Sequence, residues 1–518
     1  MDGFFDAATT VSDFLWGGTW GDQRILPVGI ITIALLGTGL IFMLRLGLRP
    51  LRRLFPAFGE LWSGRKGAGE GEITPWQALS TALSGQVGTG NLAGVATAIT
   101  LGGPGAIFWM WITALFGMAA AYAESSLAVR YREKHPDGHF HGGPMYYIKN
   151  GLGKHWGWLA VLFCIGTILS AIGTGGMIQA NSITQSAVEA GRSMGVAVPN
   201  WSVGAVIAVL VFIVIIGGIK SIGSVAGKII PFMAGAYILA ALFVIITHIE
   251  FIPNAFMLII GGAFGWEQAG GGLAGYGVLA AIRAGVARGL FSNEAGQGSA
   301  PIAHAAAQTK NPVKQGEIAM LGVFIDTMII CTMTALVILV VQGAYPSGGG
   351  ATVDYAWQST TLEASAITTA AFAEGMMYGA WVILAAQALF AFTTIIGWSY
   401  YAEQCLTYIA GDWAAKPFRF AWVGVAFVGT LITNVTGLWR FGDIANASML
   451  LPNVVALLLL SGAVVAYTKR FDKTGELPPN WAGDVWGTEP PAEGESDPSD
   501  PDDPDYHPPS TPEGKSAE

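Results

Sequence analysis

The chain has 518 residues, of which 52% are hydrophobic and only 12% are charged, whereas soluble domains carry about 25% charged residues. This composition excludes an ordinary soluble protein and predicts a chain that is largely embedded in a membrane. The formal net charge of −9 does not describe the apolar part, because residues 475–518 alone hold twelve acidic residues against one lysine.

Residues 1–24 form the first segment of the chain. They lack the basic stretch that opens a secretory signal, so we expect no signal peptide here. Their large apolar side chains predict a short helix that lies at the membrane interface on the extracytoplasmic side. These side chains are Phe4, Phe5, Phe14, Leu15, Trp16 and Trp20.

Eleven apolar segments follow, each long enough to cross a hydrocarbon core of about 30 Å. They predict an all-α integral membrane protein whose transmembrane domain covers about residues 25–470. The predicted spans are 25–44, 75–100, 104–129, 156–188, 202–218, 227–248, 277–305, 315–342, 365–400, 418–436 and 443–467.

Two of these spans are predicted to be interrupted helices. Thr81–Gly105 is apolar, yet it contains glycines at positions 85, 88, 90 and 94, and each glycine in a helix interior costs about 0.5–1 kcal/mol. The segment Ser84–Asn91 reappears about two hundred residues later as Ser292–Ser299, with serine and two glycines at matching positions. Paired breaks of this kind mark the binding site of many transporters. The alternative is that these glycines serve only close helix packing. That alternative does not explain why polar residues occur at matching positions in both segments.

The first span is extra, and the other ten divide into two repeats of five, at about 75–248 and 277–468. Because five is odd, the second repeat is expected to enter the membrane in the opposite sense. Basic residues are concentrated in alternate loops, which predicts an extracytoplasmic N-terminus and a cytoplasmic C-terminus. These basic residues lie at 45–66, 130–154, 220–228, 310–314, 416–419 and 469–473.

The C-terminal segment 475–518 has a different composition, with ten prolines beside its acidic residues. Such a segment cannot bury a core, so we expect a disordered, acidic, cytoplasmic tail. Its role stays open between a solvating tail and a regulatory or partner-binding one.

Sequence motifs for catalysis are scarce, so we expect no enzyme. Gly223–Lys228 is one residue too short for a phosphate-binding loop and argues against an ATP-driven pump. The three cysteines lie in apolar stretches, and the histidines at positions 135, 139 and 141 share a polar loop, so we expect no metal cluster. A channel or a membrane sensor is the less favoured class, because the polar residues cluster at one depth and the acidic tail is too polar to be an output domain.

Placing a polar residue inside a membrane span costs free energy, so such residues indicate a structural or functional role. Glu294 in the second break has two interpretations: it binds a substrate or cation, or it caps a half-helix. Glu124 is interpreted as a structural partner of Arg130, and Asp326 stays open. Thr393 and Thr394 also have two interpretations: their hydroxyls donate hydrogen bonds to carbonyls of their own helix, or they serve as hard-oxygen ligands for Na⁺.

Gly103–Gly117, reading GPGAIFWMWITALFG, resembles the signature of the alanine or glycine:cation symporters, also called sodium:alanine symporters. The stretches Gly88–Asn91 and Ser292–Ser299 are similar to that family as well, and the resemblance covers roughly 25–470. It implies the LeuT-like fold with a five-plus-five inverted repeat in an inner (cytoplasmic) membrane. It also implies symport of alanine or glycine with Na⁺, with H⁺ coupling or another small solute as the alternative; oligomeric state stays open, and a monomer is compatible.

The resemblance further implies which residues form the site. The substrate would be bound by Gln86, Gly88, Thr89, Gly90, Asn91, Phe291, Ser292, Asn293, Glu294, Gly296, Gln297 and Trp398. Na⁺ would be held by Thr393 and Thr394.

Overall fold

The structure is a computed structural model. It describes residues 10–475, apart from 22, 27, 68, 136, 137, 267–273, 348, 349 and 434. The predicted acidic tail and the aromatic residues of the first nine positions lie outside the described residues.

The described chain is mostly helical, as predicted. The α-helices are α2 (Ile30–Arg45), α3 (Arg49–Arg52), α4 (Leu54–Ser63), α5 (Pro75–Gln86), α6 (Ala93–Gly102), α7 (Ala106–Arg130), α8 (Pro144–Tyr147), α9 (Gly157–Ser170), α10 (Ile178–Ser193), α11 (Asn200–Ile215), α12 (Gly218–Thr247), α13 (Ile252–Phe264), α14 (Ala274–Asn293), α15 (Ala300–Ala305), α16 (Pro312–Val323), α17 (Thr332–Val340), α18 (Ala364–Gly375), α19 (Gly379–Ala410), α20 (Ala415–Leu431), α21 (Val435–Leu459) and α22 (Ser461–Thr474).

Shorter elements connect or extend these helices. The π-helices are η1 (Asp13–Gly17), η4 (Ile148–Leu152), η6 (Ala171–Met177) and η9 (Phe324–Cys331), and the 3₁₀-helices are η2 (Gly64–Lys66), η3 (Thr89–Asn91), η5 (Lys154–Trp156), η7 (Ile249–Phe251), η11 (Ala356–Gln358) and η12 (Asp412–Ala414). Antiparallel hairpins pair β1 (Thr19–Trp20) with β2 (Gln23–Arg24), β3 (Glu133–Lys134) with β4 (Phe140–His141), and β5 (Tyr345–Pro346) with β6 (Thr352–Val353).

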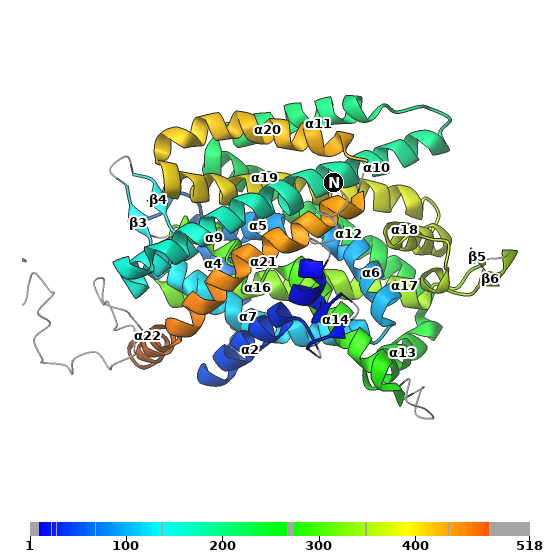
Figure 1. Cartoon of the computed structure of the whole chain (residues 1–518), viewed down its shortest axis with the longest axis horizontal. Helices are drawn as coiled ribbons and strands as arrows, with labels where there is room; N and C mark the ends of the chain where they lie inside the picture. Colours follow the sequence, from blue (N-terminus) through cyan, green and yellow to red (C-terminus); the bar gives the residue numbers. More distant parts are fainter. Residues whose placement is uncertain are drawn as a thin grey trace, which may run out of the picture.

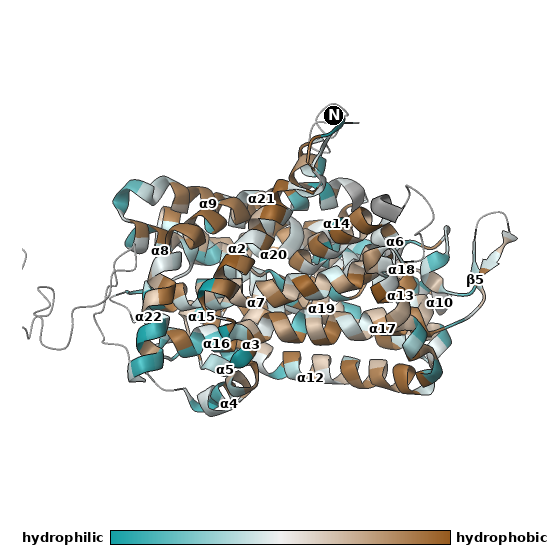
Figure 2. Cartoon of the chain, turned by 90° about the horizontal axis from the view of Figure 1, so that it is seen from below, coloured by the Kyte–Doolittle hydropathy of each residue, from teal (hydrophilic) through white to brown (hydrophobic). Residues whose placement is uncertain are grey.

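The long helices run along the longest axis of the molecule (Figure 1). Among the described residues, six helical stretches are long and apolar enough to cross a membrane, and four shorter apolar helices accompany them. Hydrophobic residues cover most of their length, and hydrophilic residues gather at the end where α22 lies (Figure 2). The chain is therefore a multi-pass membrane protein.

The two ends of the molecule carry different connecting elements. The hairpin β3–β4 and helix α22 lie at one end, and the hairpin β5–β6 and helix α13 lie at the other (Figure 1). The sequence assigns the first pair of elements to the cytoplasm and the second pair to the outside.

Each predicted span overlaps a helix, but several boundaries differ. The predicted span 365–400 is divided between α18 and α19, with Tyr378 in the left-handed region at φ 63° between them. Helix α19 then continues to Ala410, so Thr393 and Thr394 lie in its middle. The apolar run extends through the turn, which is why hydropathy does not reveal the boundary. The LeuT-like pairing of two five-helix repeats stays a prediction.

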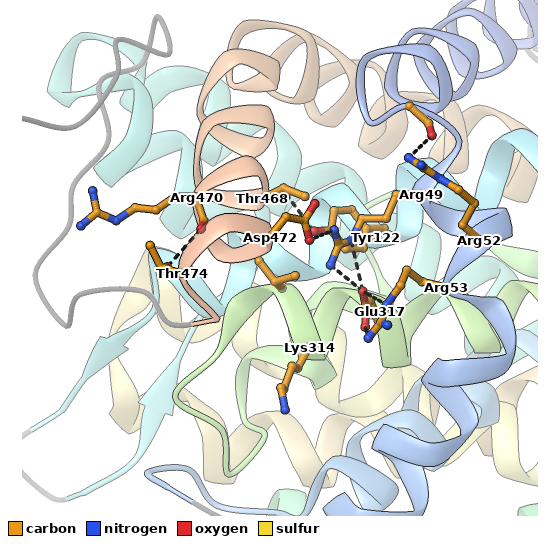
Figure 3. Close-up of polar contacts among 12 residues, drawn as sticks. Arg49, Arg52, Arg53, Tyr122, Lys314, Glu317, Thr468, Arg470, Asp472 and Thr474 are labelled. Carbon is orange, nitrogen blue, oxygen red and sulfur yellow. Dashed lines mark hydrogen bonds and ion pairs between the residues drawn. The ribbon is translucent and has the colours of Figure 1, made fainter. Parts of the chain in front are cut away.

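The first helices are tied to the last by a buried ion cluster (Figure 3). Arg49 Nη2 lies 2.7 Å from Glu317 Oε1, and Arg53 Nε lies 2.9 Å from the same oxygen. Arg49 also pairs with Asp472 of α22. The Glu317 side chain is fully buried, so its two arginine partners offset the large cost of burying one charge. This cluster fixes α3, α4, α16 and α22 at one end of the bundle.

Candidate functional site

The first predicted break is present between α5 and α6. Helix α5 ends at Gln86, Val87 and Gly88 are extended, and η3 precedes the start of α6 at Ala93. Asn91 stabilises the break, because its Oδ1 accepts a 2.9 Å hydrogen bond from the Gly88 N–H. A Cβ atom on Gly88 would lie 2.6 Å from Thr394 Oγ1, so a glycine is required for this close approach.

The second predicted break separates α14 from α15. Glu294 has a φ of 55°, which is uncommon for a residue with a side chain. Its carboxylate accepts hydrogen bonds from Trp398 Nε1 at 2.9 Å and from Ser299 Oγ at 2.6 Å. These contacts hold the strained residue in place and fix its carboxylate against α19 and the start of α15.

The two breaks face each other. Gln86 Nε2 donates to the Asn293 carbonyl at 2.9 Å, which links the end of α5 to the end of α14. Asn91 Nδ2 and Ser292 Oγ donate to the same oxygen of Asp326, at 2.5 and 3.1 Å. Asp326 is fully buried and has no lysine or arginine partner in the described part of the chain. This acid, left open by the sequence, therefore bridges both breaks.

A small cavity lies where the breaks meet. It offers about 20 Å³ to the centre of a water-sized sphere, and one water requires roughly 10–15 Å³ by this measure. An amino acid is several times larger, so the cavity is too small to hold one in this conformation. The lining residues are Gly85, Gln86, Gly88, Gly90, Thr174, Gln179, Phe291, Glu294, Gln297, Thr394, Trp398 and Asn446.

The predicted site residues fall into two groups. Eight line the cavity, namely Gln86, Gly88, Gly90, Phe291, Glu294, Gln297, Thr394 and Trp398. The other six, Thr89, Asn91, Ser292, Asn293, Gly296 and Thr393, are not among the lining residues. Asn293, for example, donates from Nδ2 to Thr327 Oγ1 at 3.1 Å. Several of this second group hold the breaks in shape.

The two threonines of α19 point to different neighbours. Thr394 Oγ1 lies 3.5 Å from the Val87 carbonyl in the first break. Thr393 Oγ1 lies 3.8 Å from Met233 Sδ in α12. Both hydroxyls also donate to the Phe390 carbonyl, at 2.9 and 3.0 Å, so they back-bond to their own helix. Only Thr394 lies against the first break.

Glu124 does not pair with Arg130, and that expectation was wrong. Its carboxylate accepts hydrogen bonds from the Gly296 N–H at 3.2 Å and from Asn453 Nδ2 at 3.1 Å. Asn453 also donates to the Gly296 carbonyl at 2.9 Å. Residues six apart on a helix point to sides about 120° apart, so Glu124 faces the second break and Arg130 does not.

Thr174, Gln179 and Asn446 line the cavity but are absent from the predicted set. Thr174 belongs to the π-helix η6, Gln179 to α10 and Asn446 to α21. Their polar side chains inside apolar spans are the signal that could have identified them. The sequence does not show which face of each helix points into the cavity.

A second cavity of about 400 Å³ lies at the end of α19, on the side of the β3–β4 hairpin. Tyr400 and Gln404 line it, together with the ion pair Arg419–Glu403, whose Nη2 and Oε1 lie 2.6 Å apart. Tyr400 and Trp398 both belong to α19, so this polar cavity lies along the same helix as the buried site.

Comparison with known proteins identifies the family. Residues 19–478 match the sodium:alanine symporter family. The chain is 41% identical to the sodium/alanine symporter AgcS of Methanococcus maripaludis, over 91% of this chain and 98% of AgcS. It is 42% identical to an uncharacterized transporter of Haemophilus influenzae, over 89% of this chain and 95% of that protein. It is 37% identical to the amino-acid carrier protein AlsT of Bacillus subtilis, over 91% and 93% of the two chains.

Among solved structures, a manganese transporter of Eremococcus coleocola aligns with a TM-score of 0.48 at 12% identity, covering 76% of this chain and 78% of that one. The family match and the curated relatives support cation-coupled amino-acid transport. The chain belongs to the sodium:alanine symporter family.

Proposed function

We propose that this protein is a secondary active transporter that moves a small neutral amino acid, alanine or glycine, together with Na⁺ by alternating access. The observation that carries the proposal is the meeting of two helix breaks at one small buried cavity. Breaks of this kind expose backbone groups where a substrate can use them.

The two ends of an amino acid suit different parts of this site. The first break leads into the N-terminus of α6, where free N–H groups and the helix dipole favour a carboxylate. The second break supplies the Glu294 carboxylate, which is buried and has no lysine or arginine partner among the described residues. We assign the substrate carboxylate to the first break and its ammonium group to Glu294 and nearby carbonyls.

The cation is proposed to bind beside Thr394. The hydroxyl of this residue and the Val87 carbonyl provide two hard oxygens from different helices, 3.5 Å apart, and hard cations prefer oxygen ligands. The Phe390 carbonyl lies next to both threonines. Because Val87 belongs to the first break, a cation here would stabilise the same segment that receives the substrate, which couples the two ligands.

Small substrates are favoured by the walls of the cavity. Trp398 and Phe291 occupy the space that a longer side chain would need, and Gly88 and Gly90 bring the backbone close on the other side. A methylene group more or less in such a pocket changes the binding free energy by about 1–3 kcal/mol. We therefore propose glycine and alanine over leucine.

The orientation follows the positive-inside rule. We propose an inner (cytoplasmic) membrane location with the N-terminus outside, so that the 400 Å³ cavity beside Tyr400 opens toward the cytoplasm. Substrate leaving the buried site would enter this cavity. Coupling to H⁺ is the alternative for the driving ion, because Asp326 and Glu294 are buried acids at the breaks.

The test is counterflow of labelled alanine in proteoliposomes, with and without Na⁺. Vesicles preloaded with unlabelled alanine or glycine should accumulate label only when Na⁺ is present, and preloaded leucine should not support accumulation. The control variant is Gly88→Val, which places a side chain against Thr394 and should abolish counterflow. Exchange that is unaffected by removing Na⁺ at fixed pH would contradict sodium coupling, and no exchange with any neutral amino acid would contradict the proposed substrate class.

A further inference from the structure

One wall of the cavity is polar and does not come from either break. Thr174 and Asn446 line the cavity, and both side chains are nearly buried, with 4% and 3% of their surfaces exposed. They belong to η6 and α21, elements that the breaks do not include. The function proposed above does not use these residues.

Glycines place this wall close to the rest of the site. A Cβ atom on Gly175 would lie 2.4 Å from Trp398 Cβ, and one on Gly442 would lie 2.6 Å from Thr174 Cγ2. Both positions therefore require glycine, because any side chain there would prevent η6 from packing against α19 and α21. Thr174 and Trp398 consequently lie on neighbouring surfaces of one narrow cavity.

Hydrogen bonds fix the orientation of the Asn446 amide. Ser170 Oγ donates to Asn446 Oδ1, and Thr174 Oγ1 lies 3.4 Å from the same oxygen. The Thr174 hydroxyl donates to the Ser170 carbonyl at 2.6 Å. The oxygen of Asn446 is thus committed to the protein, and its Nδ2 has no hydrogen-bond partner among the described residues. Because Asn446 lines the cavity, this donor is available to a ligand there.

We infer that Asn446, positioned by Thr174 and Ser170, determines side-chain specificity by donating a hydrogen bond to a side-chain hydroxyl of the substrate. The site then takes serine in addition to alanine and glycine. This inference depends on the proposed function and names a further substrate class for the same site. The hydroxymethyl side chain of serine accepts a hydrogen bond from the Asn446 amide. An ethyl side chain of nearly the same size leaves that amide unpaired. A binding site discriminates most strongly between substrates when the wrong one leaves a polar group of the site without a partner.

The test compares serine with α-aminobutyrate, which replaces the hydroxyl by a methyl group. Both are used as unlabelled competitors of alanine uptake in proteoliposomes, and as ligands that raise the melting temperature of purified protein. One hydrogen bond predicts that serine competes about fivefold better in the wild type. Asn446→Leu should reduce that ratio to about one.

Two further variants keep the test decisive. Ser448 lies on the same helix as Asn446, and among the described residues its hydroxyl bonds only to the Ala445 carbonyl. The control variant Ser448→Ala should therefore keep the wild-type ratio. Thr174→Val should reduce the ratio by loosening the amide, and it replaces Asn446→Leu if that variant does not fold.

A wild-type ratio near one would overturn the inference while leaving alanine transport intact. An equal loss of alanine and serine affinity in Asn446→Leu would also overturn it, because Asn446 would then act on the common part of the substrate. Absence of binding by every amino acid would instead overturn the proposed function, and so the two failures are distinguishable.

Discussion

The indole Nε1 of Trp398 donates a 2.9 Å hydrogen bond to Glu294 Oε1. This contact joins the middle of α19 to the second break, and both residues line the cavity. Trp398 therefore does two things: it occupies volume, and it holds the Glu294 carboxylate at the cavity. The aromatic wall and the charged group of the site form one unit.

Removing the aromatic wall should widen substrate selection. Trp398→Ala should lower alanine affinity by about tenfold, equivalent to about 1.4 kcal/mol, and allow valine and leucine to compete. Phe291→Ala should produce a smaller change in the same direction, because the Phe291 ring also packs against Trp439, with ring centroids 5.3 Å apart and the rings tilted by 44°. The measurement is inhibition of labelled alanine uptake by serine, valine and leucine.

The control for that series is Trp381→Ala on the same helix. Trp381 is 41% exposed and does not line the cavity, so its replacement should preserve selectivity. Wild-type competition profiles in both Trp398→Ala and Phe291→Ala would place the size-limiting wall elsewhere.

Removing one threonine hydroxyl should weaken the cation more than the amino acid. Thr394→Val keeps the shape of the side chain but removes the oxygen beside the Val87 carbonyl. Loss of one such contact is worth about 1 kcal/mol, so the Na⁺ concentration for half-maximal uptake should rise about fivefold. Thr393→Val tests the other predicted ligand, and its effect should be smaller because its hydroxyl lies toward Met233.

Thr97→Val is the matched control, since within the described part of the chain the Thr97 hydroxyl bonds only to the Ala93 carbonyl of its own helix, at 2.7 Å. Unchanged Na⁺ dependence in both α19 variants would show that the cation binds elsewhere or that H⁺ drives transport.

Arg132 should stabilise the two interrupted helices at their shared end. Its guanidinium donates at 2.7–2.8 Å to four carbonyls, those of Ala305, Ala307, Thr309 and Glu70. These carbonyls lie before α5 and at the end of α15, where Ile73 and Ala307 form a parallel bridge. Lysine keeps the charge but not the planar fork of donors, so Arg132→Lys should cost about 2–3 kcal/mol.

The measurement is the melting temperature of purified protein, which should fall by a few degrees. Arg192→Lys is the control, because the Arg192 side chain is 75% exposed and its ion pair with Glu189 is a surface pair of little energetic value. Equal melting temperatures for Arg132→Lys and wild type would contradict this stabilising role of Arg132.

The breaks were predictable from the sequence because glycines and amides contrast strongly with the apolar residues around them. Eight of the residues that the family resemblance implied line the cavity. The polar wall was not predictable in the same way. Thr174 and Asn446 lie outside the two breaks and carry no glycine-rich pattern shared between the repeats, and only the packing of η6 and α21 shows that they line the cavity.

Two other differences have simple physical causes. Glu124 was matched with Arg130 by closeness in sequence, whereas helix geometry turns the carboxylate to the second break. The start of α19 was misplaced because hydropathy averages over residues and does not detect the turn at Tyr378. Side-chain direction and turns are tertiary properties, and so these details required the structure.

The predicted topology can be checked with single cysteines. The native Cys164, Cys331 and Cys405 are buried and should remain unlabelled in the background. Thr352→Cys in β6 and Lys473→Cys in α22 are at exposed positions. An impermeant thiol reagent should label only the first in intact cells and both after the cells are opened, whereas labelling of Lys473→Cys in intact cells would reverse the proposed orientation.

The most direct test of the account is whether an amino-acid gradient moves sodium. Linkage requires that, if Na⁺ strengthens alanine binding, alanine strengthens Na⁺ binding equally. In proteoliposomes with equal Na⁺ on both sides, an inward alanine gradient should drive uptake of radioactive Na⁺, and Thr394→Val should reduce that uptake. Alanine uptake without accompanying Na⁺ movement, together with acidification of the vesicle interior, would contradict sodium symport and establish proton coupling instead.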